Sequence, residues 1–203
     1  MAGDITIGVL ALQGAVQEHL EMVERCGARG IAVKRPAGLN DVSGLIIPGG
    51  ESTVIGKLIE EYGFEGDLMK MAADGVPIFG TCAGLIVLAK SVTGRHGPVL
   101  SLMDVTVERN AFGRQVDSFE QDVRLAGIDD PDRPFRAVFI RAPVIEENGA
   151  GVEVMGRVER GIVMARQGNL LGCAFHPELT GDSRVHRYFM QMVEAWTARD
   201  VEV

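Results

Sequence analysis

A cysteine in a small-residue turn constrains the fold of this chain more than any other feature. The run Gly80-Thr81-Cys82-Ala83-Gly84 follows apolar residues 76–79 and precedes residues 85–90, which are apolar up to Ala89 and end with Lys90. This order is typical of a strand, a tight turn and a helix, and it lifts a nucleophile out of the sheet edge. The helix N-terminus favours a thiolate over a thiol. We therefore predict that Cys82 is a nucleophile, with a buried structural cysteine as the alternative.

Strand-like and helix-like segments alternate along the first half of the chain. Buried-strand patterns lie at 5–12, 30–34, 44–47 and 76–79, and helical spacing lies at 16–26, 53–62 and 67–74. Strand-like runs at 105–109, 135–140, 152–155, 161–165 and 169–175 follow, before a closing helix at 182–198. We predict a single α/β domain over residues 1–203, with a mainly parallel sheet, helices on both faces and short antiparallel strands in the second half.

Three local signals refine this pattern. Ser52 or Thr53 is expected to cap the helix at 53–62. Gly168-Asn169 is a hairpin turn signal between two strand-like runs. The polar, proline-containing stretch 129–134 is expected to be a surface turn.

Composition narrows the class of protein. The chain has 203 residues, of which 46% are hydrophobic and 24% charged, as in ordinary soluble globular domains. Its formal net charge of -8 argues against nucleic acid or an anionic membrane as the main partner. The odd number of cysteines, at Cys26, Cys82 and Cys173, indicates no disulfide framework and favours a reducing compartment. With no apolar run long enough to cross a membrane and no basic signal region at residues 1–4, we expect a cytoplasmic protein.

A histidine and a carboxylate lie two residues apart at the end of the strand-like run 169–175. His176 lies at the strand end where open α/β sheets place ligand sites. Pro177 keeps the backbone of His176 extended, so that Glu178 can reach the imidazole nitrogen facing away from Cys82. Such a bond fixes the tautomer and stabilises the imidazolium. We therefore predict Cys82, His176 and Glu178 as a catalytic triad for acyl transfer. The remaining histidines, His19, His96 and His186, are interpreted as surface or helix-face residues.

Two glycines follow the strand-like run 44–47, in Pro48-Gly49-Gly50-Glu51-Ser52. Such a loop can turn its amides toward an anion, which suits either a phosphate nest or half of an oxyanion hole. No lysine follows at P-loop spacing, which argues against a nucleotide site. Beside a cysteine nucleophile we expect an oxyanion hole from Gly50 and the Ala83 amide. The sequence contains no Cys-x-x-Cys and no histidine pair at ligand spacing, so no metal is expected.

These motifs resemble those of class I (triad) glutamine amidotransferases, and within them the PdxT/SNO family, the glutaminase subunits of pyridoxal 5'-phosphate synthase. The segments that carry the resemblance are 8–15, 48–53, 79–85, 107–119, 139–143 and 175–180. Many amidotransferases share the cysteine and His-Pro-Glu motifs. Residues 108–115 (Glu-Arg-Asn-Ala-Phe-Gly-Arg-Gln) and 140–143 (Ile-Arg-Ala-Pro) are the discriminating segments.

The resemblance implies a flavodoxin-like, three-layer fold and hydrolysis of L-glutamine to L-glutamate and ammonia. In such a reaction Cys82 forms a thioester, His176 moves protons and Glu178 orients His176. The glutamine-binding residues that the resemblance implies are Gly49, Gly50, Glu51, Arg109, Ile140 and Arg141. A carboxylate and an arginine also suit the charges of glutamine. The ammonia would pass to a separate synthase subunit, in a complex of twelve glutaminase subunits around a dodecameric core, and no cofactor is implied for this subunit.

Three other functions share parts of this pattern. They are a glutaminase for a different synthase, a hydrolase of γ-glutamyl peptides, and a partner-binding module without catalysis. The segment 107–119 argues against the first, and the complete triad argues against the last. Ammonia release measured with and without the synthase subunit distinguishes among them.

Overall fold

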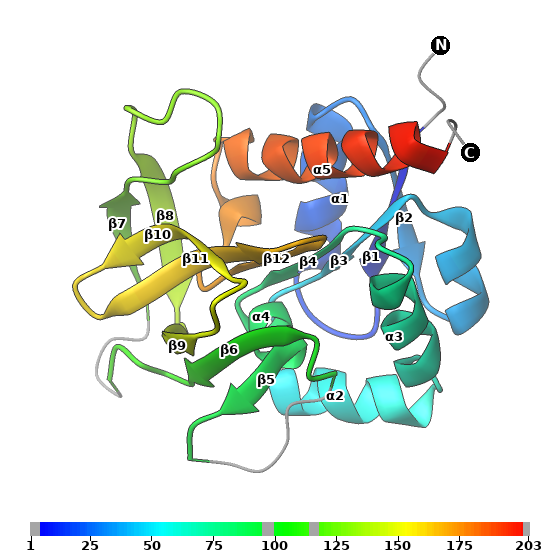
Figure 1. The fold of residues 1–203 in the computed structure, drawn as a ribbon, viewed down its shortest axis with the longest axis horizontal. Helices are drawn as coiled ribbons and strands as arrows, with labels where there is room; N and C mark the ends of the chain where they lie inside the picture. The colour runs from blue at the N-terminus through cyan, green and yellow to red at the C-terminus, as the bar shows by residue number, and fades with distance from the viewer. Residues whose placement is uncertain (1–4, 95–99, 114–117, 201–203) are drawn as a thin grey trace.

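Five neighbouring strands form a parallel half-sheet in the middle of the molecule (Figure 1). The computed structural model describes residues 5–94, 100–113 and 118–200. Within them, these strands lie in the order β2 (Arg29–Val33), β1 (Thr6–Leu10), β3 (Gly44–Ile47), β4 (Ile78–Thr81) and β12 (Leu170–Cys173). Every neighbouring pair in this set is parallel. The predicted parallel sheet is thus confirmed, and β3, β4 and β12 are buried along their whole length.

The second half of the chain extends the same sheet with mainly antiparallel pairs. Beyond β12 lie β11 (Gly161–Gln167), β9 (Val144–Asn148), β6 (Met103–Glu108) and β5 (Ala89–Val92), while β10 (Glu153–Val158) pairs with β11. The strands β7 (Ser118–Val123) and β8 (Phe135–Ile140) form a separate antiparallel pair. β11 and β12 are joined at Gly168-Asn169 as an antiparallel hairpin, as the turn signal predicts.

Helices cover both faces of the sheet (Figure 1). α1 (Val16–Arg25) and α5 (Arg184–Asp200) lie on one face, and α2 (Ser52–Glu61), α3 (Glu65–Ala73) and α4 (Ala83–Leu88) lie on the other. Two short 3-10 helices, η1 (Pro36–Asp41) and η2 (Pro177–Leu179), complete the set among the described residues. The α5 stripe of Val185, Phe189 and Val193 is buried, because helical spacing places these side chains on one face.

Local details differ from the sequence-based expectations. The helix that follows the cysteine turn ends at Leu88. Ala89 begins β5, because residues 89–92 pair with β6. The cap of α2 is Glu51, whose side chain accepts a hydrogen bond from the Thr53 amide at 3.2 Å; the expected cap at Ser52 or Thr53 is wrong. The patterns do not predict β5, β7 and β9, because much of each strand is polar and exposed.

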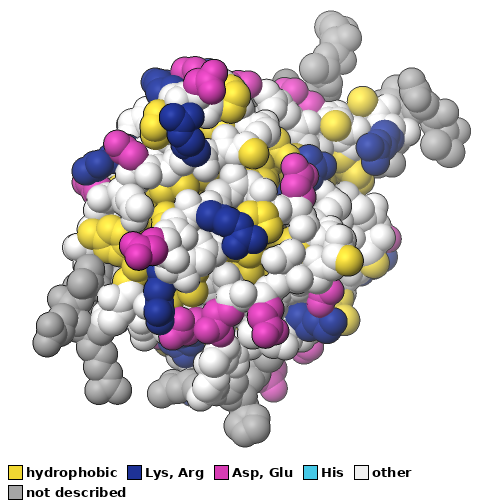
Figure 2. Space-filling view, turned by 60° about the vertical axis from the view of Figure 1, so that its left-hand side comes forward, with side chains coloured by type: hydrophobic (Ala, Val, Ile, Leu, Met, Phe, Trp, Pro, Cys, Tyr) yellow, Lys and Arg dark blue, Asp and Glu magenta, His cyan; other side chains and the backbone are white. Residues whose placement is uncertain are grey.

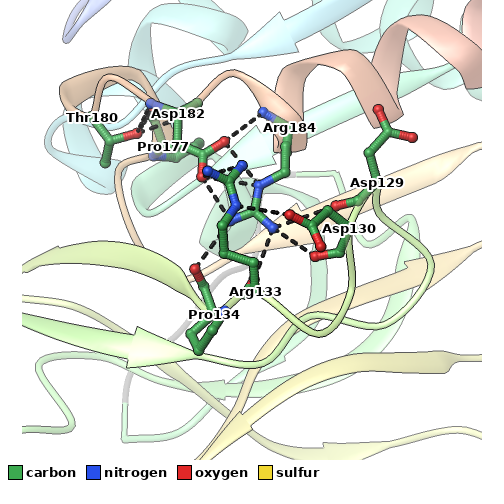
Figure 3. A network of polar contacts seen from close by, with 8 residues as sticks. All are labelled: Asp129, Asp130, Arg133, Pro134, Pro177, Thr180, Asp182 and Arg184. Atoms are coloured by element: carbon green, nitrogen blue, oxygen red, sulfur yellow. Dashed lines mark hydrogen bonds and ion pairs between the residues drawn. The ribbon is translucent and has the colours of Figure 1, made fainter.

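A buried arginine ties the start of α5 to the loop between β7 and β8 (Figure 3). The Arg184 guanidinium donates to both carboxylate oxygens of Asp182 at 2.7–3.0 Å. It also donates to the carbonyls of Asp130, Arg133 and Pro134 at 2.8–3.0 Å. The side chains of 129–134 lie at the surface as predicted, while these carbonyls turn inward. The network anchors the chain immediately after η2, the segment that carries Glu178.

The surface mixes charges of both signs. On the face shown in Figure 2, acidic and basic side chains are interspersed with smaller apolar areas, so the described residues visible there form no broad basic patch. Among the described residues, no helix combines the length and the apolar character that a bilayer span requires.

Candidate active site

The carboxyl ends of four neighbouring parallel strands converge on one cavity. Residues 11–15 follow β1, residues 48–51 follow β3, Cys82 follows β4, and His176 lies shortly after β12. Because these strands run in the same direction, their carboxyl ends share one edge of the sheet, where α/β folds place ligand sites. The cavity at this edge has a volume of about 310 Å³.

Most of the residues predicted for the site line this cavity. They are Gly49, Gly50, Glu51, Cys82, Ala83, Arg109, Ile140, Arg141 and His176. Glu178 does not line it and instead contacts His176. The wall also includes residues to which the sequence patterns assign no role in the site: Gln13, Gly14, Ala15, Ser52, Ile86 and Asn110. All of them except Ile86 belong to segments 8–15, 48–53 and 107–119 of the family resemblance, which is the signal that could have identified them.

Cys82 occupies a strained turn between β4 and α4. Its backbone lies at φ 49° and ψ -102°, a conformation that residues with a side chain rarely adopt. The turn is tight because α4 packs directly on β3: a Cβ on Gly84 would lie 2.0 Å from the Ile47 carbonyl oxygen. Ala83 begins α4, so its amide is one of the N-terminal N–H groups without a partner inside the helix. The sulfur therefore lies beside a free amide donor.

His176 is held between the cysteine and a buried carboxylate. Its Nδ1 lies 2.7 Å from Glu178 Oε1, and its backbone amide donates to the Val138 carbonyl at 2.8 Å. Burial works to lower the pKa of His176, but hydrogen bonds and opposite charge from Cys82 and Glu178 outweigh it and raise that pKa to about 10. The imidazole is thus protonated at neutral pH in the substrate-free site.

The glycine loop, residues 48–51, is hydrogen-bonded to the segment that follows β1. The Ala15 amide donates to the Gly49 carbonyl at 3.0 Å, and the Glu51 amide donates to Gln13 Oε1 at 2.7 Å. Both hydrogen bonds join a backbone atom of this loop to a residue of segment 13–15. The loop is therefore positioned by tertiary contacts as well as by its own glycines.

Two opposite charges meet at the cavity wall. Arg109 Nη2 lies 3.0 Å from Glu51 Oε1, and the two side chains keep 21% and 41% of their exposure. Burial works to raise the pKa of Glu51, but hydrogen bonds from Thr53 and the charge of Arg109 outweigh it and lower that pKa. Glu51 is therefore an ionised carboxylate beside a guanidinium. A pair this exposed is held weakly, because water screens it.

Two histidines interpreted as surface or helix-face residues are buried. His19 on α1 and His186 on α5 are both 0% exposed, so the surface interpretation is wrong for them. His96 lies outside the described residues. Helical spacing is the signal that could have found both: His19 shares a buried face with Met22, and His186 shares one with Phe189.

Comparisons with solved structures agree with the observed fold. A crystal structure of a glutamine amidotransferase superposes with a TM-score of 0.86 at 47% sequence identity, covering 92% of this chain and 98% of that chain. A glutamine amidotransferase from Thermotoga maritima superposes with a TM-score of 0.60 at 13% identity, covering 98% of this chain and 86% of that one. The second match shows the fold alone, and it confirms the predicted three-layer architecture.

Comparisons with known sequences identify the family. Relatives that carry the name pyridoxal 5'-phosphate synthase subunit PdxT include the following two. The protein from Pelotomaculum thermopropionicum is 56% identical over 185 residues, which is 91% of this chain and 93% of that protein. The protein from Bacillus licheniformis is 56% identical over 190 residues, which is 94% of this chain and 95% of that protein. The sequence model of the SNO glutamine amidotransferase family matches residues 9–195. This chain therefore belongs to the SNO glutamine amidotransferase family.

Proposed function

We propose that this protein hydrolyses L-glutamine to L-glutamate and ammonia through a thioester on Cys82. The observation that carries the proposal is the convergence of Cys82, His176 and Glu178 at one sheet edge, with His176 Nδ1 2.7 Å from Glu178 Oε1. Membership of the SNO glutamine amidotransferase family supports the same reaction. A nucleophile, a base and an orienting carboxylate are the parts that acyl transfer requires.

The first half of the reaction forms the thioester. Cys82 gives its thiol proton to His176 and attacks the side-chain amide carbon of glutamine as a thiolate, and the carbonyl oxygen becomes an oxyanion. Protonated His176 then donates its proton to the amide nitrogen, so that ammonia leaves and the thioester remains.

The second half of the reaction hydrolyses the thioester. Neutral His176 takes a proton from water, whose oxygen attacks the thioester carbon. Glutamate leaves and the cysteine is regenerated, while Glu178 keeps the imidazole in one orientation throughout.

The oxyanion needs donors placed before the reaction begins. The Ala83 amide at the start of α4 is one such donor, and the Gly50 amide is the proposed second. Both residues line the cavity beside Cys82. Removing one donor from an oxyanion hole typically lowers turnover by about 10²–10³.

The charged residues of the cavity wall suit the main-chain end of glutamine. The Glu51 carboxylate can take the ammonium, and Arg109 or Arg141 can take the carboxylate. The exposed Glu51–Arg109 pair can open for this purpose at little cost. Ile140 and Gly49 contribute backbone and shape to the same wall. These are the substrate roles that the family resemblance implies.

We propose that the ammonia passes to a synthase subunit of pyridoxal 5'-phosphate biosynthesis. The relatives that are 56% identical carry that name. Following the family resemblance, twelve copies of this chain would surround a dodecameric synthase core, and the glutaminase itself would use no cofactor. All three cysteines are free, which suits work in a reducing cytoplasm.

The test is ammonia release from glutamine by the parent chain, Cys82→Ala and Cys26→Ala, each alone and with the synthase subunit. Cys26 is a matched control, because it is a free cysteine outside the cavity. We expect Cys82→Ala to lose turnover and Cys26→Ala to keep it, and a glutamine-like electrophile to add its mass to Cys82. An adduct on Cys26 or Cys173, or full turnover by Cys82→Ala, would contradict the proposal. Parent turnover that needs a different synthase would favour the first alternative.

A further inference from the structure

We propose, on the basis of that proposed function, that His19 is a positioning residue that holds the Glu178 carboxylate and thereby His176 in line for turnover. His19 belongs to α1 and does not line the cavity. It reaches the triad from behind, at the end of the carboxylate that faces away from His176.

The two oxygens of Glu178 have unequal surroundings. The side chain of Glu178 is 0% exposed. Oε1 lies 2.7 Å from His176 Nδ1, whereas Oε2 is buried and accepts no hydrogen bond from the described residues. His19 Nε2 lies 3.4 Å from Oε2. A carboxylate oxygen only accepts hydrogen bonds, and burying it without a donor is costly. His19 is placed to supply that donor.

The neighbouring contacts assign the tautomers of both buried histidines. His19 Nδ1 lies 3.0 Å from His186 Nε2, and His19 Nε2 lies 3.0 Å from Thr81 Oγ1. With the proton on Nε2, His19 donates to Thr81 Oγ1 and places the same N–H group 3.4 Å from Glu178 Oε2, while Nδ1 accepts from the Nε2–H of His186. The opposite arrangement would turn a lone pair toward the carboxylate and leave the Nδ1–H of His186 buried without an acceptor. The first arrangement is therefore the stable one.

His19 acts as a neutral donor in this arrangement. Burial, with smaller contributions from the charges of His186 and His176, holds the pKa of His19 well below its usual value. Burial also lowers the pKa of His186 to about 3. The single positive charge of the network thus remains on His176, where proton transfer needs it. His19 thus places a neutral N–H group 3.4 Å from Glu178 Oε2 and adds no second positive charge beside the carboxylate.

Three substitutions distinguish a role of His19 as a hydrogen-bond donor from a role in packing alone. In His19→Gln the amide nitrogen takes the place of Nε2 and keeps a donor toward Glu178. In His19→Asn the shorter side chain reaches only the place of Nδ1 and loses that donor. Thr81→Val removes the hydroxyl that shares His19 Nε2 and keeps the shape of the side chain. Each variant is compared with the parent chain in the synthase complex for kcat and KM on glutamine, and alone for its melting temperature.

We expect His19→Asn to lower kcat by roughly 10- to 100-fold, as for the loss of the one N–H group beside a buried charge. KM should stay close to that of the parent, because His19 does not touch the cavity. His19→Gln should recover most of kcat, and Thr81→Val should keep it. A downfield proton NMR resonance from His176 Nδ1–H should shift or broaden in His19→Asn and return in His19→Gln.

Several results would overturn this role. Parent-like kcat and resonance in His19→Asn would do so, as would equal losses in His19→Asn and His19→Gln that follow the melting temperature. A loss in Thr81→Val as large as that in His19→Asn would assign the contact to the hydroxyl instead. A parent chain without glutaminase activity would refute the proposed function, whereas the His176 resonance would still decide the role of His19.

Discussion

Replacing Gly49 by alanine should remove most turnover while leaving the fold in place. A Cβ at this position would lie 2.4 Å from Cε1 and 2.9 Å from Nδ1 of His176. The backbone of Gly49 does not have the positive φ that only glycine favours, so alanine meets a steric obstacle and no conformational one. Either the imidazole or the loop must shift by about 1 Å to reach the ordinary contact distance of 3.4 Å.

Neither side of this contact is free to shift. The imidazole is hydrogen-bonded to the buried carboxylate of Glu178 at 2.7 Å, and the Gly49 carbonyl accepts a hydrogen bond from the Ala15 amide at 3.0 Å. A displacement of about 1 Å in a catalytic group can lower turnover by roughly 10²-fold. Overpacking of this kind costs about 1–3 kcal/mol of folding free energy, which a domain of this size tolerates.

The assay compares kcat for glutamine hydrolysis by Gly49→Ala and Gly66→Ala in the synthase complex. Gly66 is a matched control, because a Cβ there in α3 meets nothing within 4 Å. We expect Gly66→Ala to match the parent chain and Gly49→Ala to fall about 10²-fold below it. Circular dichroism checks that both variants are folded. A kcat of Gly49→Ala equal to that of Gly66→Ala would refute the steric argument.

Two further predictions concern stability. Arg184→Lys should lower the free energy of unfolding by about 2–4 kcal/mol. The reason is that a lysine ammonium cannot replace the planar guanidinium, which donates hydrogen bonds to Asp182 and to three loop carbonyls. A melting temperature equal to that of the parent would contradict this. The raised pKa of His176, about 10 when folded against 6.5 when free, stabilises the parent fully below pH 6.5, and this contribution is lost as the pH rises through 10. The stability gap between the parent and His176→Asn, measured by urea unfolding, should therefore narrow from pH 6.5 to above pH 10, and a gap independent of pH would reject the assignment.

The sequence by itself determined the local units of the fold and the chemistry of the proposed site. The apolar run before Cys82 and the small residues around it define a strand and a tight turn, because these depend on neighbours in the chain. Pro177 places Glu178 within reach of His176 for the same reason, and the structure brings their side chains within 2.7 Å. The motifs also indicated the family, which the comparisons show independently.

Only the tertiary structure decided which residues from distant segments meet. Helical spacing can place His19 on the buried face of α1, but it does not say which group the imidazole meets there. Packing of α1 against η2 places His19 behind Glu178. Pairing with β6 likewise ends α4 at Leu88, although the apolar run extends to Ala89. The physical reason is the same in both cases: burial and partner choice depend on surfaces that exist only after the sheet has formed, so no window of sequence contains them.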